Sequence, residues 1–335
     1  MKTANPRFGL VLTGGGAKGA YQAGALKYIA ELDLIPNIIA GTSIGALNGA
    51  VLSAYCPFPQ AVEQLNKFWE ELAEAEILRP NTSTVIRTLS YTAQTFVPTL
   101  REWIFSFLLE QGLLKDSNAI FDPTPIEQIL RKKINWHNLK NGIELWVTVF
   151  PSLKIPGLGY DWLIDFVRAR TGTDAHWLCV QNLRDEETIY NLLLASAALP
   201  LAFPSREING KSYIDGGLAD NVPLGALAAR GCTHTIIIHL RNGASWNRHN
   251  FPEQTIIEIR PEQSINKSDI PVIGLIDSWL DFSYERITEL QRRGYEDAKR
   301  CLDPIIETFS TIKEQRQVQD SLINSTQRLL NDPPL

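Results

Sequence analysis

The chain has 335 residues and a formal net charge of −5, and its apolar and charged fractions of 44% and 21% are ordinary for a soluble globular protein. The acidic balance argues against a nucleic-acid-binding protein, because such proteins carry an excess of Lys and Arg. The length accommodates one large α/β domain or two smaller ones. The cysteines are far apart in sequence, which predicts reduced, buried thiols of a cytoplasmic protein rather than disulfides or a zinc site. They are Cys56, Cys179, Cys232 and Cys301.

The N-terminal region does not predict a targeting or membrane segment. Its first apolar run is too short for a signal peptide, and no small-residue cleavage site follows it. Residues 34–62 contain no charged residue and are long enough to span a bilayer. Prolines, glycines and asparagines interrupt this stretch, which favours a strand, a turn and a buried helix. We expect no transmembrane helix, and peripheral contact with a membrane stays open.

Strands and helices alternate from the start of the chain. A strand is predicted over residues 8–12, a helix over 20–32, a strand over 38–40 and a helix over 46–55. Such alternation indicates a parallel sheet that is covered by helices. One α/β domain with a mostly parallel central sheet therefore fits better than two domains.

The rest of the chain adds a helical excursion, further strands and a long final helix. Apolar, β-branched runs predict the strands, and helical periodicity predicts the helices. The expected ranges are a helix at 61–74, an excursion at about 80–140, strands at 144–150, 177–180, 235–238 and 256–259, and helices at 188–198 and 275–300.

The segment Gly41-Thr42-Ser43-Ile44-Gly45 lies where the second strand meets its helix. A serine with glycine two residues before and after it is typical of a nucleophile on a sharp strand-to-helix turn. The positive end of the helix favours negative charge on an attacking oxygen. Ser43 is therefore a candidate nucleophile, with Gly41 and Gly45 shaping its turn.

A glycine loop, Thr13-Gly14-Gly15-Gly16-Ala17-Lys18-Gly19, follows the first strand. The loop also matches a dinucleotide fingerprint, but the acidic residue that should follow the second strand is missing. A P-loop would need Lys and Ser or Thr after Gly19, where Ala20 and Tyr21 stand. A tight turn without a ligand remains an alternative.

A catalytic role for the glycine loop follows from strand order. Adjacent parallel strands end at the same edge of a sheet, so this loop should face Ser43. The amides of Gly14, Gly15 and Gly16 would then receive the oxyanion of an attacked acyl group. Lys18 would support the loop, add positive charge or be solvated.

A serine nucleophile needs a base, and the sequence offers two candidates. His239 lies at the end of the strand predicted over residues 235–238 and could reach the same edge of the sheet. Asp215 follows a short strand and precedes Gly216 and Gly217. Asp followed by Gly also occurs in ordinary hairpin turns, so the aspartate motif alone does not settle its role.

The glycine loop, the serine turn and Asp215-Gly216-Gly217, in this order, resemble those of bacterial-type patatin-like phospholipases. The similarity extends over roughly residues 7–300. It includes the segments Ala195–Pro204, Phe121–Pro125 and Arg293–Ala298.

The resemblance implies a three-layer α/β/α fold over residues 1–300, followed by a helical tail over 301–335. It also implies hydrolysis of lipid acyl esters through an acyl-enzyme, without metal or cofactor. Ser43 and Asp215 would form a dyad, and the amides of residues 14–16 would form the oxyanion hole. The motif positions in supporting roles are Lys18, Gly19, Gly41, Gly45, Gly216 and Gly217.

Two other functions stay open at this point, together with the oligomeric state. One is an esterase of the α/β-hydrolase type with a Ser43–His239 triad, although such folds usually place several strands before the nucleophile. The other is a lipid-binding module without catalysis. An apolar stripe over residues 98–109 predicts either a core helix or a lid over the site, and the loop 154–160 could border it.

Overall fold

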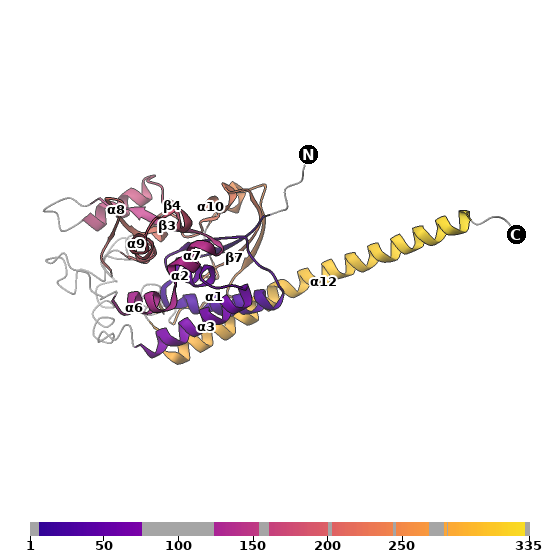
Figure 1. Ribbon diagram of the computed structural model, residues 1–335, viewed down its shortest axis with the longest axis horizontal. Helices are drawn as coiled ribbons and strands as arrows, with labels where there is room; N and C mark the ends of the chain where they lie inside the picture. The colour runs from indigo at the N-terminus through magenta and orange to yellow at the C-terminus, as the bar shows by residue number, and fades with distance from the viewer. Residues whose placement is uncertain are drawn as a thin grey trace.

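The computed structural model describes residues 7–75, 124–153, 161–199, 203–243, 246–267, 278–279 and 281–331 (Figure 1). An eight-stranded sheet forms its centre, in the order β5-β6-β3-β2-β1-β7-β8, and β4 pairs with β3. The strands are β1 (Arg7–Leu12), β2 (Ile38–Thr42), β3 (Glu144–Pro151), β4 (His176–Cys179), β5 (Arg206–Ile208), β6 (Lys211–Asp215), β7 (Cys232–Ile238) and β8 (Thr255–Ile259).

The sheet is mostly parallel. Strands β3, β2, β1, β7 and β8 run parallel to one another. Strands β4 and β6 pair antiparallel with β3, and β5 pairs antiparallel with β6. In register, Leu12 at the end of β1 lies beside Gly41 of β2 and Ile238 of β7. The expected α/β class with a mostly parallel sheet is confirmed, and β1 and β2 are neighbours as predicted.

Helices cover both faces of the sheet. The helices are α1 (Gly19–Glu31), α2 (Ile44–Ser53), α3 (Phe58–Glu74), α6 (Thr124–Lys133), α7 (Trp136–Asn141), α8 (Asp161–Arg170), α9 (Glu186–Ser196), α10 (Leu224–Ala228) and α12 (Tyr284–Asn331). Helices α1, α2, α3 and α9 pack against one face, with α12 lying across α1. Helix α10 covers the other face, so the fold has three layers.

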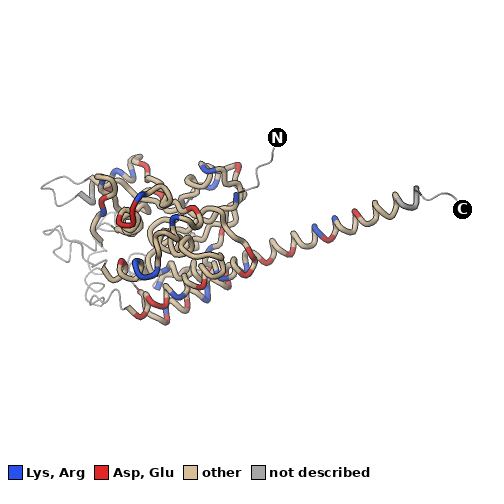
Figure 2. Tube along the Cα trace, in the orientation of Figure 1, with Lys and Arg blue, Asp and Glu red and all other residues tan. Residues whose placement is uncertain are grey.

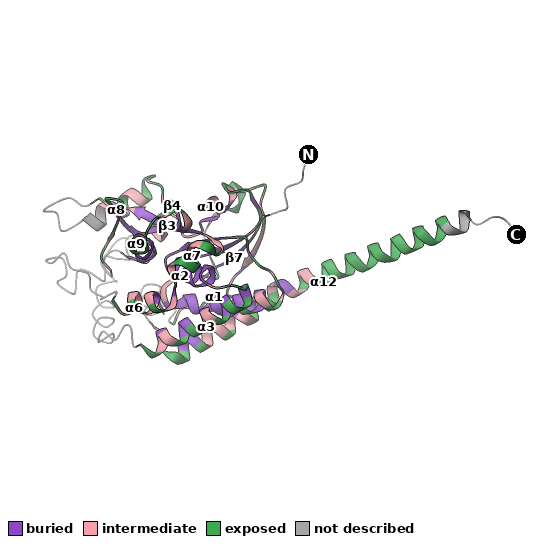
Figure 3. Cartoon of the chain, viewed as in Figure 1, coloured by how far each residue is buried: buried purple, intermediate pink, exposed green. Residues whose placement is uncertain are grey.

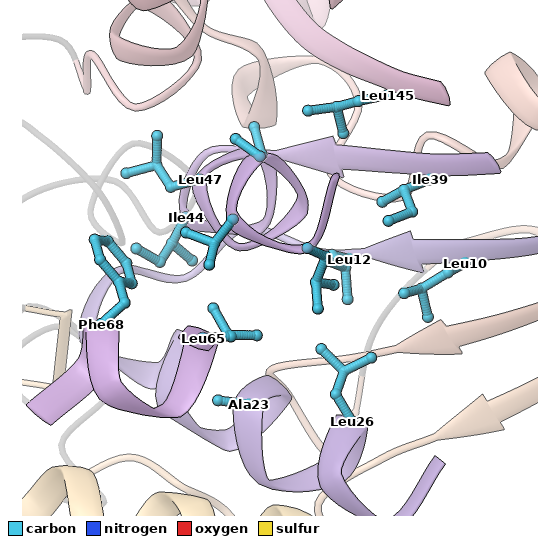
Figure 4. Packing of buried hydrophobic residues seen from close by; sticks show 14 of the residues in the cluster. Leu10, Leu12, Ala23, Leu26, Ile39, Ile44, Leu47, Leu65, Phe68 and Leu145 are labelled. Atoms are coloured by element: carbon cyan, nitrogen blue, oxygen red, sulfur yellow. The ribbon is translucent and has the colours of Figure 1, made fainter. Parts of the chain in front are cut away.

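The central strands are buried from both sides, which explains their apolar sequences. Every residue of β2 is buried, and so are the last four residues of β1. Figure 4 shows Leu10, Leu12 and Ile39 of the strands facing Leu26 of α1 and Leu65 of α3. This packing holds the carboxyl ends of β1 and β2 in a fixed relation.

Several of the expected elements lie outside the described residues, and others have different boundaries in the structure. Residues 98–109 and 154–160 lie outside the described residues. Of the expected excursion, residues 124–141 form α6 and α7. Helix α12 begins at Tyr284 rather than near residue 275 and runs without interruption through residue 300.

The uncharged stretch 34–62 forms β2, α2 and the start of α3. No helix in the described part of the chain is long and apolar enough to cross a membrane. The four cysteines are free thiols, but Cys56 is exposed, so the expectation of buried thiols is wrong there. It follows the end of α2, where the chain reaches the surface before α3.

Candidate active site

Ser43 occupies a sharp turn between β2 and α2. Its backbone has φ 56° and ψ −126°, in the left-handed region that non-glycine residues rarely adopt. Such strain at a serine between strand and helix is typical of a nucleophile turn. The sharp turn directs the hydroxyl group away from the helix, toward the edge of the sheet. The side chain is buried, with 8% of its surface exposed.

The two glycines of the turn allow it to lie directly against β1. A Cβ atom on Gly45 would stand 2.1 Å from the carbonyl oxygen of Leu12. A Cβ atom on Gly41 would stand 2.5 Å from the carbonyl oxygen of Gly45. Because backbone atoms form both contacts, no side-chain rotation relieves them, and only glycine fits at either position.

A buried serine that the sequence did not single out holds the backbone of Ser43. The Ser43 N–H donates to Ser196 Oγ at 2.9 Å, and the Ser196 hydroxyl donates to the Thr148 carbonyl at 2.7 Å. Ser196 is the last residue of α9 and is fully buried. It lies in the segment 195–204, which is part of the family resemblance but carries no catalytic pattern of its own.

We expect Ser196→Ala to lower the free energy of unfolding by about 1–3 kcal/mol, because the Ser43 N–H loses its buried acceptor. Ser53→Ala is the matched control, since the buried Ser53 hydroxyl has no hydrogen-bond partner in the described part of the chain. Urea unfolding of both variants makes the comparison. Equal stability of the two variants would contradict a role for Ser196 in holding the turn.

Asp215 ends β6 and points into the same region. Its backbone N–H donates to the Ala198 carbonyl at 3.0 Å, and its Oδ1 accepts from the Gly217 N–H at 2.8 Å. Oδ2 is buried and has no hydrogen-bond partner among the described residues. Gly216 and Gly217 begin the short 3₁₀ helix η4 (Gly216–Leu218).

The environment of Asp215 raises the pKa of its carboxyl group. Only 1% of the residue's surface is exposed, and this burial raises the pKa to about 7. The nearby Ser43 side chain and the Gly217 N–H act in the opposite direction. The carboxyl group therefore changes protonation near neutral pH, as a general base working in this range should.

The glycine loop lies beside the serine turn. A Cβ atom on Gly14 would stand 2.9 Å from Ser43 Cβ. The Gly14 N–H is already engaged, since it donates to Asn221 Oδ1 at 2.9 Å. Gly15 and Gly16 line a cavity of about 260 Å³ together with Ser43 and Asp215. The short 3₁₀ helix η1 (Gly16–Lys18) begins here and leads directly into α1.

A chain of buried polar side chains supports the glycine loop from behind. Trp69 Nε1 donates to Asn48 Oδ1 at 3.0 Å, and Asn48 Nδ2 donates to Gln22 Oε1 at 2.9 Å. Gln22 Nε2 in turn donates to the Thr13 carbonyl at 2.8 Å. Apolar patterning alone would have placed these polar residues on solvent-exposed helix faces. Their burial ties α1, α2 and α3 to the loop.

Lys18 is not solvated, so that alternative from the sequence is wrong. The side chain is fully buried, and its Nζ lies 3.2 Å from Asn266 Oδ1. Burial, together with the nearby charges of Arg241 and Arg286, lowers the pKa of Lys18 to about 7. The stem of Lys18 packs beneath the loop, where a Cβ on Gly15 would meet its Cε at 3.4 Å.

His239 follows β7 and lines the same cavity as Ser43. It is buried, and its Nε2 lies 2.8 Å from Glu258 Oε2, which also accepts from Trp246 Nε1 at 2.9 Å. Burial, together with the charge of Arg260, lowers the pKa of His239. The imidazole is therefore neutral near pH 7, and its Nε2–H donates to Glu258.

A serine on a strained strand-to-helix turn, a glycine loop and a buried carboxyl group thus meet at one edge of a mostly parallel α/β sheet. This arrangement defines the class of α/β proteins with a nucleophile turn. The patatin-like phospholipase family model matches residues 10–228. The chain belongs to the patatin-like phospholipase family, as its three motifs predicted.

Individual relatives match parts of the chain. Lysophospholipase NTE1 of Saccharomyces cerevisiae is 25% identical over 224 residues, which cover 67% of this chain and 10% of that protein. A putative patatin-like phospholipase domain-containing protein of Caenorhabditis elegans, M110.7, is 40% identical over 83 residues, covering 25% of this chain and 7% of that protein. The chain thus spans about a tenth of the length of these curated relatives.

Solved structures with similar folds are more distant in sequence. VipD from Legionella pneumophila has a TM-score of 0.41 and 14% identity, with 90% of this chain and 67% of that chain covered. Human GIVD cytosolic phospholipase A2 has a TM-score of 0.43 and 11% identity, with 91% and 60% covered.

Proposed function

We propose that this protein is a serine lipid acyl hydrolase that works through a Ser43–Asp215 dyad. The observation that carries the proposal is the shared cavity: both side chains line it, and burial tunes the Asp215 carboxyl group to titrate near neutral pH. Membership in the patatin-like phospholipase family supports a lipid ester as the substrate. The family is described as patatin-like phospholipases and the NTE1 relatives as lysophospholipases, so phospholipids and lysophospholipids are the substrate classes that we propose.

In the proposed first step, Ser43 Oγ forms a bond to the carbonyl carbon of the ester while Asp215 accepts the hydroxyl proton. The carbonyl oxygen becomes an oxyanion. When the tetrahedral intermediate collapses, the ester C–O bond breaks, and Asp215 returns the proton to the departing alcohol. A water molecule then repeats the sequence on the acyl-enzyme, releasing the fatty acid and restoring Ser43.

The amides of Gly15 and Gly16 are the proposed donors to the oxyanion. They line the cavity beside Ser43, where preorganised N–H groups stabilise developing charge. The Gly14 amide, which was also expected to contribute, donates to Asn221 and could join only if that hydrogen bond opens. Buried Lys18 adds positive charge behind the loop in its protonated form.

A fluorophosphonate probe tests the proposal directly. The native protein should be labelled at Ser43, and Ser43→Ala should not be labelled. The native protein should also release fatty acid from a lysophospholipid, and Ser43→Ala should not. Absence of labelling in folded native protein would favour a lipid-binding module without catalysis.

His239 is a second candidate base because it lines the same cavity. Its Nε2–H already donates to Glu258, and its neutral state suits a structural role at the end of β7. We expect His239→Gln to keep most of the hydrolytic rate, measured on the same lysophospholipid. Loss of turnover in a folded His239→Gln protein would replace the dyad with a triad.

The pH dependence of hydrolysis should report the titration of Asp215. The base acts in its ionised form, and burial raises the pKa of Asp215 to about 7. The value of kcat/KM should therefore reach a plateau above this pKa and fall about tenfold per pH unit below it. Initial rates with a soluble ester at pH 5–9 test this. A profile that is flat down to pH 5 would exclude Asp215 as the base.

A further inference from the structure

The second half of α12 extends away from the body of the protein as a single helix (Figure 1). Its first half packs against α1 and α3 through buried Ile287, Leu290, Ala298 and Leu302. Every residue from 307 to 327 is exposed (Figure 3). Most of the stability of helices in proteins comes from packing of an apolar face, and residues 307–327 pack against nothing among the described residues.

The apolar stripe that anchors α12 to the body continues along the projecting segment. Leu302 and Ile305 are followed at three- and four-residue steps by Phe309 and Ile312, and then by Ile323. Of these, Phe309, Ile312 and Ile323 are 68%, 41% and 47% exposed. Large apolar side chains repeated at this spacing form the seam of a coiled coil.

Polar residues interrupt the seam at its centre. Arg316 and Gln319 occupy the two stripe positions between Ile312 and Ile323. Polar residues at such positions specify the register and orientation of paired helices, at some cost in stability. The pairing must therefore satisfy the Arg316 charge as well as cover the apolar side chains.

We propose that the projecting segment of α12 pairs antiparallel with the same segment of a second copy of this chain. In the register centred between residues 317 and 318, Ile312 lies opposite Ile323 of the second copy, and Arg316 lies opposite Gln319. A parallel pair in register would place Arg316 against Arg316, which like-charge repulsion disfavours. The antiparallel pair also places the two bodies at opposite ends of the joined helices.

The charges that flank the seam fit the antiparallel register. Lys313 and Asp320 each directly follow a stripe position and are one heptad apart, so they lie on the same side of the apolar stripe. Figure 2 shows that basic and acidic residues both occur along the projecting helix. In the antiparallel pair, Lys313 of each copy meets Asp320 of the other, so two opposite-charge pairs form across the seam. In a parallel pair, Lys313 would instead face the uncharged Thr308.

The composition of the segment favours a second copy over a membrane surface. Residues 307–331 contain Glu307, Glu314 and Asp320 against Lys313, Arg316 and Arg328, so their charges cancel. A helix that lies on an anionic membrane carries a polar face rich in Lys and Arg. Here the polar face is mainly Gln, Ser, Thr and Asn, which suits contact with another protein helix.

Sedimentation velocity of the full chain over a range of concentrations tests the pairing. The native chain should dimerise, and Ile312→Asp or Ile323→Asp should weaken the dimer by at least tenfold in Kd, that is by about 1.4 kcal/mol. Val318→Asp is the matched control: Val318 is 60% exposed on the same helix but lies off the stripe. A native chain that stays monomeric, or a dimer that the stripe variants leave unchanged, would overturn the proposal.

A charge exchange tests the orientation. Lys313→Asp should weaken the dimer, and combining it with Asp320→Lys should restore it, because both cross-seam pairs re-form with reversed sign. Failure of the double variant to restore the dimer would overturn the antiparallel register.

Flotation with vesicles of phosphatidylcholine and phosphatidylserine tests whether the projecting segment binds a membrane surface instead of a second copy. A monomer that binds vesicles through the Ile312 and Ile323 stripe would assign the segment to a lipid surface instead.

Discussion

Asp215→Asn should abolish ester hydrolysis while leaving the protein folded. The amide side chain keeps the shape of the carboxyl group and can still accept from the Gly217 N–H, but it cannot take a proton from Ser43. A positioned general base contributes about 10²–10⁴ to the rate, and the nucleophile depends on it at both steps. We therefore expect kcat to fall by about a thousandfold or more, measured by fatty acid release.

The stability of Asp215→Asn provides an independent readout. Because burial raises the pKa of Asp215 from about 3.9 in the unfolded chain to about 7 in the native state, its stabilising contribution is complete below pH 4. That contribution is lost as the pH rises through 7, where the native state must hold a buried charge. The asparagine variant avoids this loss, so it should be more stable than the native protein at pH 8, but not at pH 4.

Asp220→Asn is the matched control for this substitution. Asp220 lies on the same loop, where its side chain accepts from Trp177 Nε1 and the Val222 N–H. It does not line the cavity that holds Ser43. Asp220→Asn should therefore keep hydrolytic activity. If both variants lost activity equally, or if Asp215→Asn remained active, Asp215 would not be the base.

Gly45→Ala should disrupt the serine turn and destabilise the whole domain. The added methyl group would lie 2.1 Å from the Leu12 carbonyl oxygen and 2.6 Å from its carbon, so β1 and α2 would have to separate. Overpacking against a rigid backbone costs about 3 kcal/mol or more, and here it also displaces Ser43 from the glycine loop. We expect a lower urea midpoint and loss of fluorophosphonate labelling in any protein that remains folded.

Gly243→Ala is the control for the chemistry of the substitution. A Cβ atom on Gly243 would meet nothing within 4 Å among the described residues. The free energy of unfolding of Gly243→Ala should stay within about 0.5 kcal/mol of that of the native protein, as for most surface substitutions. A Gly45→Ala protein with native stability would mean that the turn does not pack on β1 as described.

Local features of the site were predictable because they depend on neighbouring residues. The serine turn and the glycine loop each follow a short apolar strand and open a helix, which periodicity and glycine spacing reveal. Their juxtaposition also followed, because β1 and β2 are consecutive parallel strands and pair directly. The family resemblance was needed to choose Asp215 over His239, since both lie at strand ends.

Contacts between distant segments could not be predicted in this way. Ser196 at the end of α9 accepts from the Ser43 N–H, and Asn221 accepts from the Gly14 N–H. Each contact joins residues from separate elements and leaves no periodic signal in the sequence. Lys18 likewise reads as a surface lysine, and only the packing around the loop buries it.

The sequence by itself determined the class of fold, the position of the serine turn and the order of the motifs, because strand and helix periodicity and glycine geometry are local properties. Only the tertiary structure decided which polar groups are buried and therefore how they titrate. The antiparallel pairing of β6 with β3 brings Asp215 to the serine turn, and the surrounding packing raises the pKa of its carboxyl group to about 7. Burial depends on every neighbour at once, so it emerges only when the chain is folded.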